Sequence, residues 1–121
     1  MKGEGRGTRR INSVRDLEVY KLAFETAMEI FEISKQFPKE ETYSLTGQAR
    51  RSSRSVCTNL AEGWRKLSDA AQEAAETQTW LEFALRCDYI NKGIFDKLDD
   101  KYEHIFAMLF TMGQKVETFC K

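Results

Sequence analysis

Apolar residues recur every three or four positions along most of the chain, which is the spacing of one face of an α-helix. Breaks in this pattern divide the chain into four segments. The predicted helices run from about Ser13 to the residues before Pro38, from about Ser44 to Lys66, from Ser68 to about Tyr89, and from Asn91 onwards. Because the links between them are short, consecutive helices are expected to be antiparallel neighbours. The pattern therefore predicts an all-α protein, an up-down-up-down four-helix bundle.

Residues that commonly begin or end helices stand at these breaks. Ser13 followed by Asp16 can cap the free backbone N–H groups of the first helix. Ser68 and Asn91 are suitable N-cap residues for the third and fourth helices. Pro38 is expected to end the first helix, because the residue before a proline avoids the α conformation.

The second and fourth segments carry the most informative apolar faces. The face of the second segment consists mostly of small residues: Leu45, Ala49, Ser52, Val56, Leu60 and then Gly63 or Trp64. The face of the fourth is the longest: Phe95, Leu98, Tyr102, Ile105, Leu109, Met112, Val116 and Phe119. Small residues let neighbouring backbones approach closely, so we expect the second helix to be central and tightly packed. The fourth helix is expected to supply a long bundle seam.

Four aromatic residues on the last two helices exceed what one bundle axis can bury. They are Trp80, Phe83, Phe106 and Phe110. Large exposed apolar patches usually mark partner surfaces, so these residues are the predicted interface of a homo-oligomer. The alternative is a wide core face, since bundle helices often bury an additional position.

Length and composition agree with one helical domain. The chain has 121 residues, of which 41% are hydrophobic and 31% charged, with 7 glycines and 1 proline. So few turn residues nearly exclude an all-β fold. We expect residues 1–12 to form a flexible basic tail and residues 13–121 a single bundle domain. The chain shows no apolar signal-peptide region and no membrane-length apolar stretch, so a soluble, cytoplasmic protein without a membrane partner is expected.

The net charge is zero, but the charges alternate in blocks. Residues 1–15 carry a formal charge of +4, residues 16–43 carry −4, residues 44–66 carry +4, and residues 67–121 carry −4. A neutral sum alone would argue against a nucleic-acid ligand, but a basic block on one surface could still bind phosphate groups.

The predicted nucleic-acid-binding residues lie in the two basic blocks. They are Arg50, Arg51, Arg54, Arg65 and Lys66 of the second helix, with Arg9 and Arg10 of the tail. Arginine can bind phosphate with two hydrogen bonds, and the serines around Arg50 add hydroxyl donors. The alternative, of equal weight on spacing alone, is that these arginines pair with Glu25, Glu29 and Glu32 of the first helix.

The sequence offers no constellation for catalysis or metal binding. His104 is the only histidine and is expected at the surface. The three cysteines, Cys57, Cys87 and Cys120, match neither a disulfide framework nor a metal-ligand spacing. Asn59 and Glu62 form a polar pair for which a structural role is favoured. We therefore expect no enzymatic activity, no cofactor and no metal.

Three segments carry a resemblance to a known family. They are DLEVYKLAFETAMEIFEISKQFP from Asp16 to Pro38, EETYSLTGQARRSSRSVCTNLAEGWRK from Glu40 to Lys66, and ETQTWLEFALRCDYI from Glu76 to Ile90. Together they resemble the four-helix-bundle family of the 23S ribosomal RNA intervening-sequence proteins. The positions that match its motifs are Gln48, Arg50 and Arg51 in Q-x-RR, and Asn59, Glu62 and Gly63 in N-x-AEG.

This resemblance implies a four-helix bundle that assembles as a ring, commonly a homopentamer, without established enzymatic activity. Many members are encoded within insertions in large-subunit ribosomal RNA genes. A related branch, the accessory variability proteins of diversity-generating retroelements, binds nucleic acid and a reverse transcriptase. The expected function is therefore a homo-oligomeric bundle that binds RNA or structured nucleic acid. The alternative is a protein-binding scaffold or an accessory subunit of a reverse transcriptase.

Overall fold

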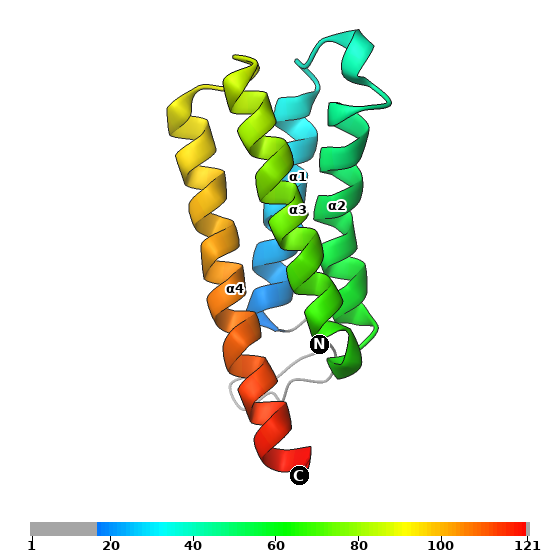
Figure 1. The fold of residues 1–121 in the computed structure, drawn as a ribbon, viewed down its shortest axis with the longest axis vertical. Coiled ribbons are helices and arrows are strands. Elements are labelled where there is room, and N and C mark those ends of the chain that lie inside the picture. Colours follow the sequence, from blue (N-terminus) through cyan, green and yellow to red (C-terminus); the bar gives the residue numbers. More distant parts are fainter. Residues whose placement is uncertain (1–16, 121) are drawn as a thin grey trace, which may run out of the picture.

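The structure, a computed structural model, describes residues 17–120, with side chains described through residue 115. It consists of four helices joined in sequence by short links, and no strand occurs in residues 17–120 (Figure 1). The helices are α1 (Glu18–Ser34), α2 (Leu45–Ala61), α3 (Leu67–Arg86) and α4 (Lys92–Cys120), with 3-10 turns η2 (Lys39–Glu41) and η3 (Trp64–Lys66). Figure 1 shows consecutive helices running in opposite directions, so the predicted all-α four-helix fold is confirmed.

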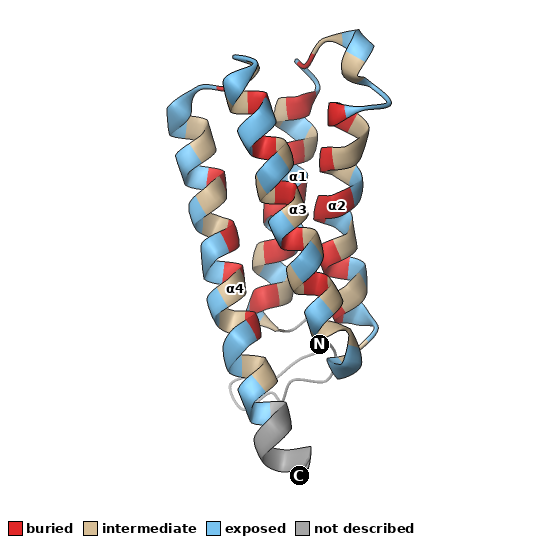
Figure 2. Cartoon of the chain, viewed as in Figure 1, coloured by how far each residue is buried: buried red, intermediate tan, exposed pale blue. Residues whose placement is uncertain are grey.

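The buried residues line the inner faces of the four helices, as Figure 2 shows. On α2, the five predicted positions from Leu45 to Leu60 are all buried. On α4, four of the predicted positions are buried: Leu98, Tyr102, Ile105 and Leu109. Phe95 and Met112 are half-buried, and the side chains of Val116 and Phe119 lie outside the described ones. The apolar periodicity therefore identified the core faces of both helices.

The helix ends differ in part from the sequence prediction. Helix α2 ends at Ala61 and not at Lys66, because Gly63 adopts a φ of 112°, which a residue with a side chain rarely adopts. The 3-10 turn η3 follows, and it leaves Trp64 more than half exposed, so Trp64 is not part of the core face. Helix α3 then begins at Leu67, and no side chain caps it, so the predicted Ser68 cap is wrong.

The other predicted ends have mixed outcomes. The Asn91 cap of α4 is confirmed, since its Oδ1 accepts a 2.8 Å hydrogen bond from the backbone N–H of Ile94. Helix α1 ends at Ser34, four residues before Pro38. The predicted cap at Ser13 and Asp16 lies outside the described residues.

A polar contact lies in the centre of the core, between α2 and α3. The hydroxyl oxygens of Ser52 and Thr77 are 2.7 Å apart, and the Thr77 hydroxyl also lies 2.8 Å from the backbone carbonyl of Glu73. Both side chains are fully buried. The Ser52 hydroxyl also lies 3.4 Å from the backbone carbonyl of Ala49, so the proton of each hydroxyl has an acceptor within the core. The nearby Tyr102 is also fully buried, but its hydroxyl has no hydrogen-bond partner among the described residues.

Glu41 holds together two links at one end of the bundle. Its Oε1 accepts hydrogen bonds from the Ser44 hydroxyl at 2.6 Å and from the backbone N–H of Leu45 at 3.3 Å, at the start of α2. Its Oε2 accepts a 2.9 Å hydrogen bond from the Tyr89 hydroxyl, beyond the end of α3. The Tyr89 ring packs 5.4 Å from that of Phe37. These hydrogen bonds, chiefly that from Ser44, lower the pKa of Glu41, while the bond to Glu41 raises the pKa of Tyr89 to about 12.

We predict that Tyr102→Phe stabilises the protein. A buried hydroxyl without a partner costs about 1–3 kcal/mol, and phenylalanine keeps the packing of the ring. The free energy of unfolding from urea denaturation should rise by about 1 kcal/mol. Thr77→Val is the contrasting variant, since it removes a buried hydroxyl that bonds to Ser52 and to the Glu73 carbonyl, and it should lower that free energy by about 1 kcal/mol. A loss of stability in Tyr102→Phe would contradict the prediction.

We predict that Glu41→Gln lowers stability in a pH-dependent manner. The folded pKa of Glu41 is below its ordinary value of 4.5, so its ionised form contributes stability above that pH. This contribution is lost as the pH falls through the lowered pKa. In thermal unfolding the variant should therefore be less stable than the wild type at pH 7, and this difference should shrink at an acidic pH below 4.5. Glu40→Gln, on the same 3-10 turn, should match the wild type at both pH values.

Candidate nucleic-acid interface

Arg50 joins α2 to the last turn of α1. Its Nε donates a 2.8 Å hydrogen bond to the Ser34 hydroxyl, and its Nη2 donates one of 3.3 Å to the backbone carbonyl of Phe31. The guanidinium also lies 4.7 Å from the centre of the Phe31 ring. The last turn of α1 leaves carbonyl groups unsatisfied and carries partial negative charge, and a cation stabilises both. Arg50 is therefore held by its own protein as a cap of α1.

Arg51, one residue further along, faces α3 instead. It forms ion pairs with Glu73, at 3.4 Å, and with Glu76. Its Nε also donates to the side-chain carbonyl of Gln48 at 3.1 Å. Glu76 accepts a further 3.2 Å hydrogen bond from the indole N–H of Trp80. This network links α2 to α3 and occupies the guanidinium of Arg51 within the protein.

The glutamates of α1 do not pair with these arginines, so that alternative from the sequence is wrong. Lys101 of α4 forms ion pairs with two of these glutamates, with Nζ to Oε2 distances of 2.5 Å to Glu29 and 4.0 Å to Glu25. Glu32 pairs with Lys35 on its own helix at 3.2 Å. The partners of Arg51 are instead Glu73 and Glu76, which are three residues apart on α3 and were not predicted from the sequence.

Arg54 lies on the side of α2 that faces α1. Its side chain is exposed, and its guanidinium lies 5.7 Å from the centre of the Phe31 ring. Among residues 17–115 it forms no ion pair. It lines a groove of about 270 Å³ between α1 and α2, whose other lining residues are Tyr20, Phe24, Ala27, Met28, Cys57, Thr58 and Ala61. Phe24 and Met28 are 49% and 48% exposed.

Arg65 and Lys66 lie on η3, at the end of the bundle where α1 begins (Figure 1). Arg65 is exposed and makes no ion pair within the described side chains. Lys66 pairs with Glu62 at 3.9 Å and with Asp69 at 3.3 Å. Trp64 beside them is 56% exposed. The predicted tail residues Arg9 and Arg10 lie outside the described residues.

The four predicted interface aromatics form two separate groups, one on α3 and one on α4. Trp80 and Phe83 have ring centres 6.0 Å apart, and the Trp80 bond to Glu76 places this pair on the side of α2. Phe106 and Phe110 lie on α4, where Glu103 on the same side accepts a 2.8 Å hydrogen bond from Gln78 of α3. Phe83 and Phe110 are exposed, whereas Trp80 and Phe106 are half-buried. The four residues thus form two pairs and not one surface, and their role as an interface stays a prediction.

The described residues offer little catalytic chemistry. No group of three or more His, Cys, Asp or Glu side chains among them could hold a metal ion. Burial raises the pKa of the Cys57 thiol to about 11, so it is protonated at neutral pH and a poor nucleophile. Glu62 is exposed and paired with Lys66, so it is not buried together with Asn59.

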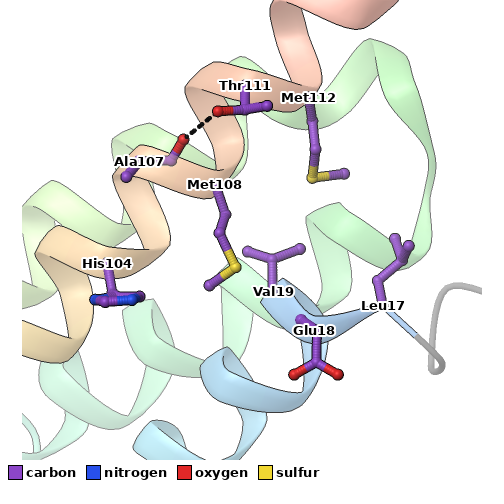
Figure 3. A pocket seen from close by; sticks show the side chains of 8 residues that line it. All are labelled: Leu17, Glu18, Val19, His104, Ala107, Met108, Thr111 and Met112. Carbon is purple, nitrogen blue, oxygen red and sulfur yellow. Dashed lines mark hydrogen bonds between the residues drawn. The ribbon is translucent and has the colours of Figure 1, made fainter.

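His104 is exposed, as predicted, at the edge of a shallow pocket between α1 and α4 (Figure 3). The pocket is lined mainly by apolar side chains, among them Leu17, Val19, Met108 and Met112. Among the residues that line it, Glu18 is the other side chain that can readily exchange a proton.

No helix in the described part of the chain is long and apolar enough to cross a membrane.

Comparisons with known proteins identify the family. A family model described as 23S rRNA-intervening sequence protein matches residues 15–111. A comparison with curated proteins finds no match. Among solved structures, the chain resembles a protein of unknown function from Bacteroides thetaiotaomicron, described as belonging to the S23 ribosomal protein family, with a TM-score of 0.70 and 25% identity. The similarity covers 79% of this chain and 95% of that one. Because the family model matches most of its length, this chain belongs to the family of 23S rRNA-intervening sequence proteins.

Proposed function

We propose that this protein is a non-enzymatic homo-oligomer, pentameric as the family resemblance implies, that binds single-stranded or structured RNA. The observation that carries the proposal is the exposed pair Trp64 and Arg65 on η3, beside Lys66. An aromatic ring on which a base can stack, next to cations that can bind phosphate, is the common combination in single-strand recognition. We call Trp64, Arg65 and Lys66 the η3 end.

The η3 end suits this role better than the arginines in the middle of α2. Arg50 and Arg51 are already bound to α1 and α3, and releasing them for phosphate would cost their present hydrogen bonds. Arg65 has no such contact within the described side chains, and Lys66 has only exposed carboxylates as partners. Arg9 and Arg10, which precede α1 in the sequence, are further candidate phosphate contacts. Repetition around an oligomer would multiply this positive field.

The pairing of Arg50 and Arg51 within the protein favours a second candidate function, a protein-binding scaffold such as an accessory subunit of a reverse transcriptase. A scaffold needs fewer free cations, and the apolar groove beside Arg54 offers a surface for a protein. A complex with such a partner should survive nuclease treatment, whereas assembly through RNA should not.

We predict that Trp64→Ala and Arg65→Ala each weaken RNA binding. Loss of one stacked base costs about 1–3 kcal/mol, which corresponds to a roughly 5- to 150-fold rise in the dissociation constant. Arg65→Ala should weaken binding similarly for all sequences and reduce the salt dependence by about one phosphate contact. Fluorescence anisotropy with a labelled single-stranded RNA at several salt concentrations measures both effects.

Two control variants separate this site from other cations. Arg86→Ala removes an exposed arginine at the opposite end of the bundle and should leave RNA binding unchanged. Arg51→Ala should lower the free energy of unfolding by about 1 kcal/mol or less, because exposed ion pairs contribute little, and should also leave RNA binding unchanged. If neither Trp64→Ala nor Arg65→Ala affects affinity, the η3 end is not the binding site.

A further inference from the structure

We propose that the Arg54 groove, defined by the lining residues given above, is a docking site for α4 of a second copy of this chain. Phe110 of that copy would enter the groove while its Glu103 pairs with Arg54. This inference rests on the homo-oligomer of the proposed function, and it names the two surfaces that meet.

The groove needs an occupant that is both apolar and acidic. Its walls are apolar, and Phe24 and Met28 leave about half of their surface exposed. Its volume of about 270 Å³ suits one or two side chains better than a drug-sized ligand. Arg54 stands at its rim without an ion pair among residues 17–115, and stacking on Phe31 holds its guanidinium in place. An unpaired cation beside an apolar groove attracts an aromatic side chain with a carboxylate nearby.

Helix α4 presents such a pair on one side. Phe110 is 67% exposed, the largest exposure of any phenylalanine described. Glu103 lies two turns earlier on the same side of α4, and its residue is exposed. The carboxylate of Glu103 accepts one hydrogen bond, from Gln78, which leaves it able to accept others. Asp99 and Asp100 add negative charge to this surface, whereas Asp96 is paired with Lys92.

The spacing of the two surfaces also agrees. Glu103 and Phe110 are seven residues apart, which is about 10.5 Å along a helix. Arg54 and Ala61, which lie toward opposite ends of the groove on α2, are also seven residues apart. A second copy whose α4 runs parallel to α2 could therefore place its carboxylate at Arg54 and its phenyl ring near Ala61 together.

The geometry makes this contact head-to-tail. Helices α2 and α4 lie on opposite sides of the bundle, so one copy can receive a neighbour on one side and dock onto another with the other side (Figure 1). Contacts of this kind generate closed rings when the rotation between copies closes, and open filaments otherwise. The pair Trp80 and Phe83 lies outside both surfaces.

A charge exchange tests the proposal. Arg54→Glu and Glu103→Arg each place like charges in contact and should shift the protein from oligomer to monomer in sedimentation velocity at micromolar concentration. The double variant restores the opposite charges and should reassemble. In an equimolar mixture of the two single variants, each variant should bind the other, because contacts between unlike variants join opposite charges. Such alternation cannot close a ring with an odd number of copies, so mixed open assemblies or even-numbered rings are expected. Phe110→Ala should raise the dissociation constant about tenfold or more.

Controls exclude indirect effects on the fold. Gln78→Ala removes the hydrogen bond of Glu103 within the chain and should leave assembly intact. Phe83→Ala removes a similarly exposed ring elsewhere and should do the same. Circular dichroism should show each variant folded. Arg54→Ala provides a milder second test, since it removes the attraction without adding repulsion.

Other outcomes overturn the proposal. An oligomer that tolerates Arg54→Glu and Phe110→Ala would show that other surfaces meet, and single variants that dissociate without rescue in the double variant would do the same. A monomeric wild type would overturn the docking together with the oligomer of the proposed function. RNA binding at the η3 end is measured separately, since Arg54, Glu103 and Phe110 are not part of that site.

Discussion

The close approach of α2 and α3 is the constraint on which the rest of the structure depends. Small side chains line both helices where they meet, and Ala49, Ser52, Ala74 and Thr77 are all buried. Buried serine and threonine are acceptable there because the two hydroxyls bond to each other and to backbone carbonyls of their own helices. This contact is the most extensive between any two helices of the bundle. The short separation also lets Arg51 reach Glu73 and Glu76 across the outside of the pair.

This arrangement divides the arginines of α2 by function. A helix turns 100° per residue, so Arg50 and Arg51 point to different neighbours once α2 lies between α1 and α3. Arg50 completes the last turn of α1, and Arg51 binds the carboxylates of α3. Arg54 faces outwards beside α1, and Arg65 lies beyond the end of the helix, so neither forms an ion pair with another described side chain. A basic block that looks uniform in the sequence thus contains both structural and free cations.

The sequence predicted the parts of the structure that depend on periodicity. The buried faces of α2 and α4 follow from residues three and four positions apart, because only one face of a helix can meet the core. The same reasoning wrongly extended the second helix to Lys66. The helix ends before Gly63, whose positive φ cannot be predicted from the spacing of apolar residues. The same reasoning also failed to pair the arginines, because Glu25 and Glu73 are equivalent as carboxylates until the order of helices around the axis is known. Exposed aromatics were recognised on α3 and α4, while Phe24 and Trp64 were missed because they fit into apolar patterns.

The neutral net charge of the chain is compatible with head-to-tail association of its copies. A chain that carries a free arginine on one side and a group of carboxylates on the other can associate head-to-tail without accumulating charge, because each contact joins opposite signs. A strongly basic protein would instead repel its own copies and would need RNA or counterions to assemble. The cations of the η3 end are not consumed by such contacts, since they lie at the end of the bundle and not on the sides that meet. The proposed self-association through Arg54 and the proposed RNA binding through Arg65 therefore depend on different residues, so variants can test each one separately.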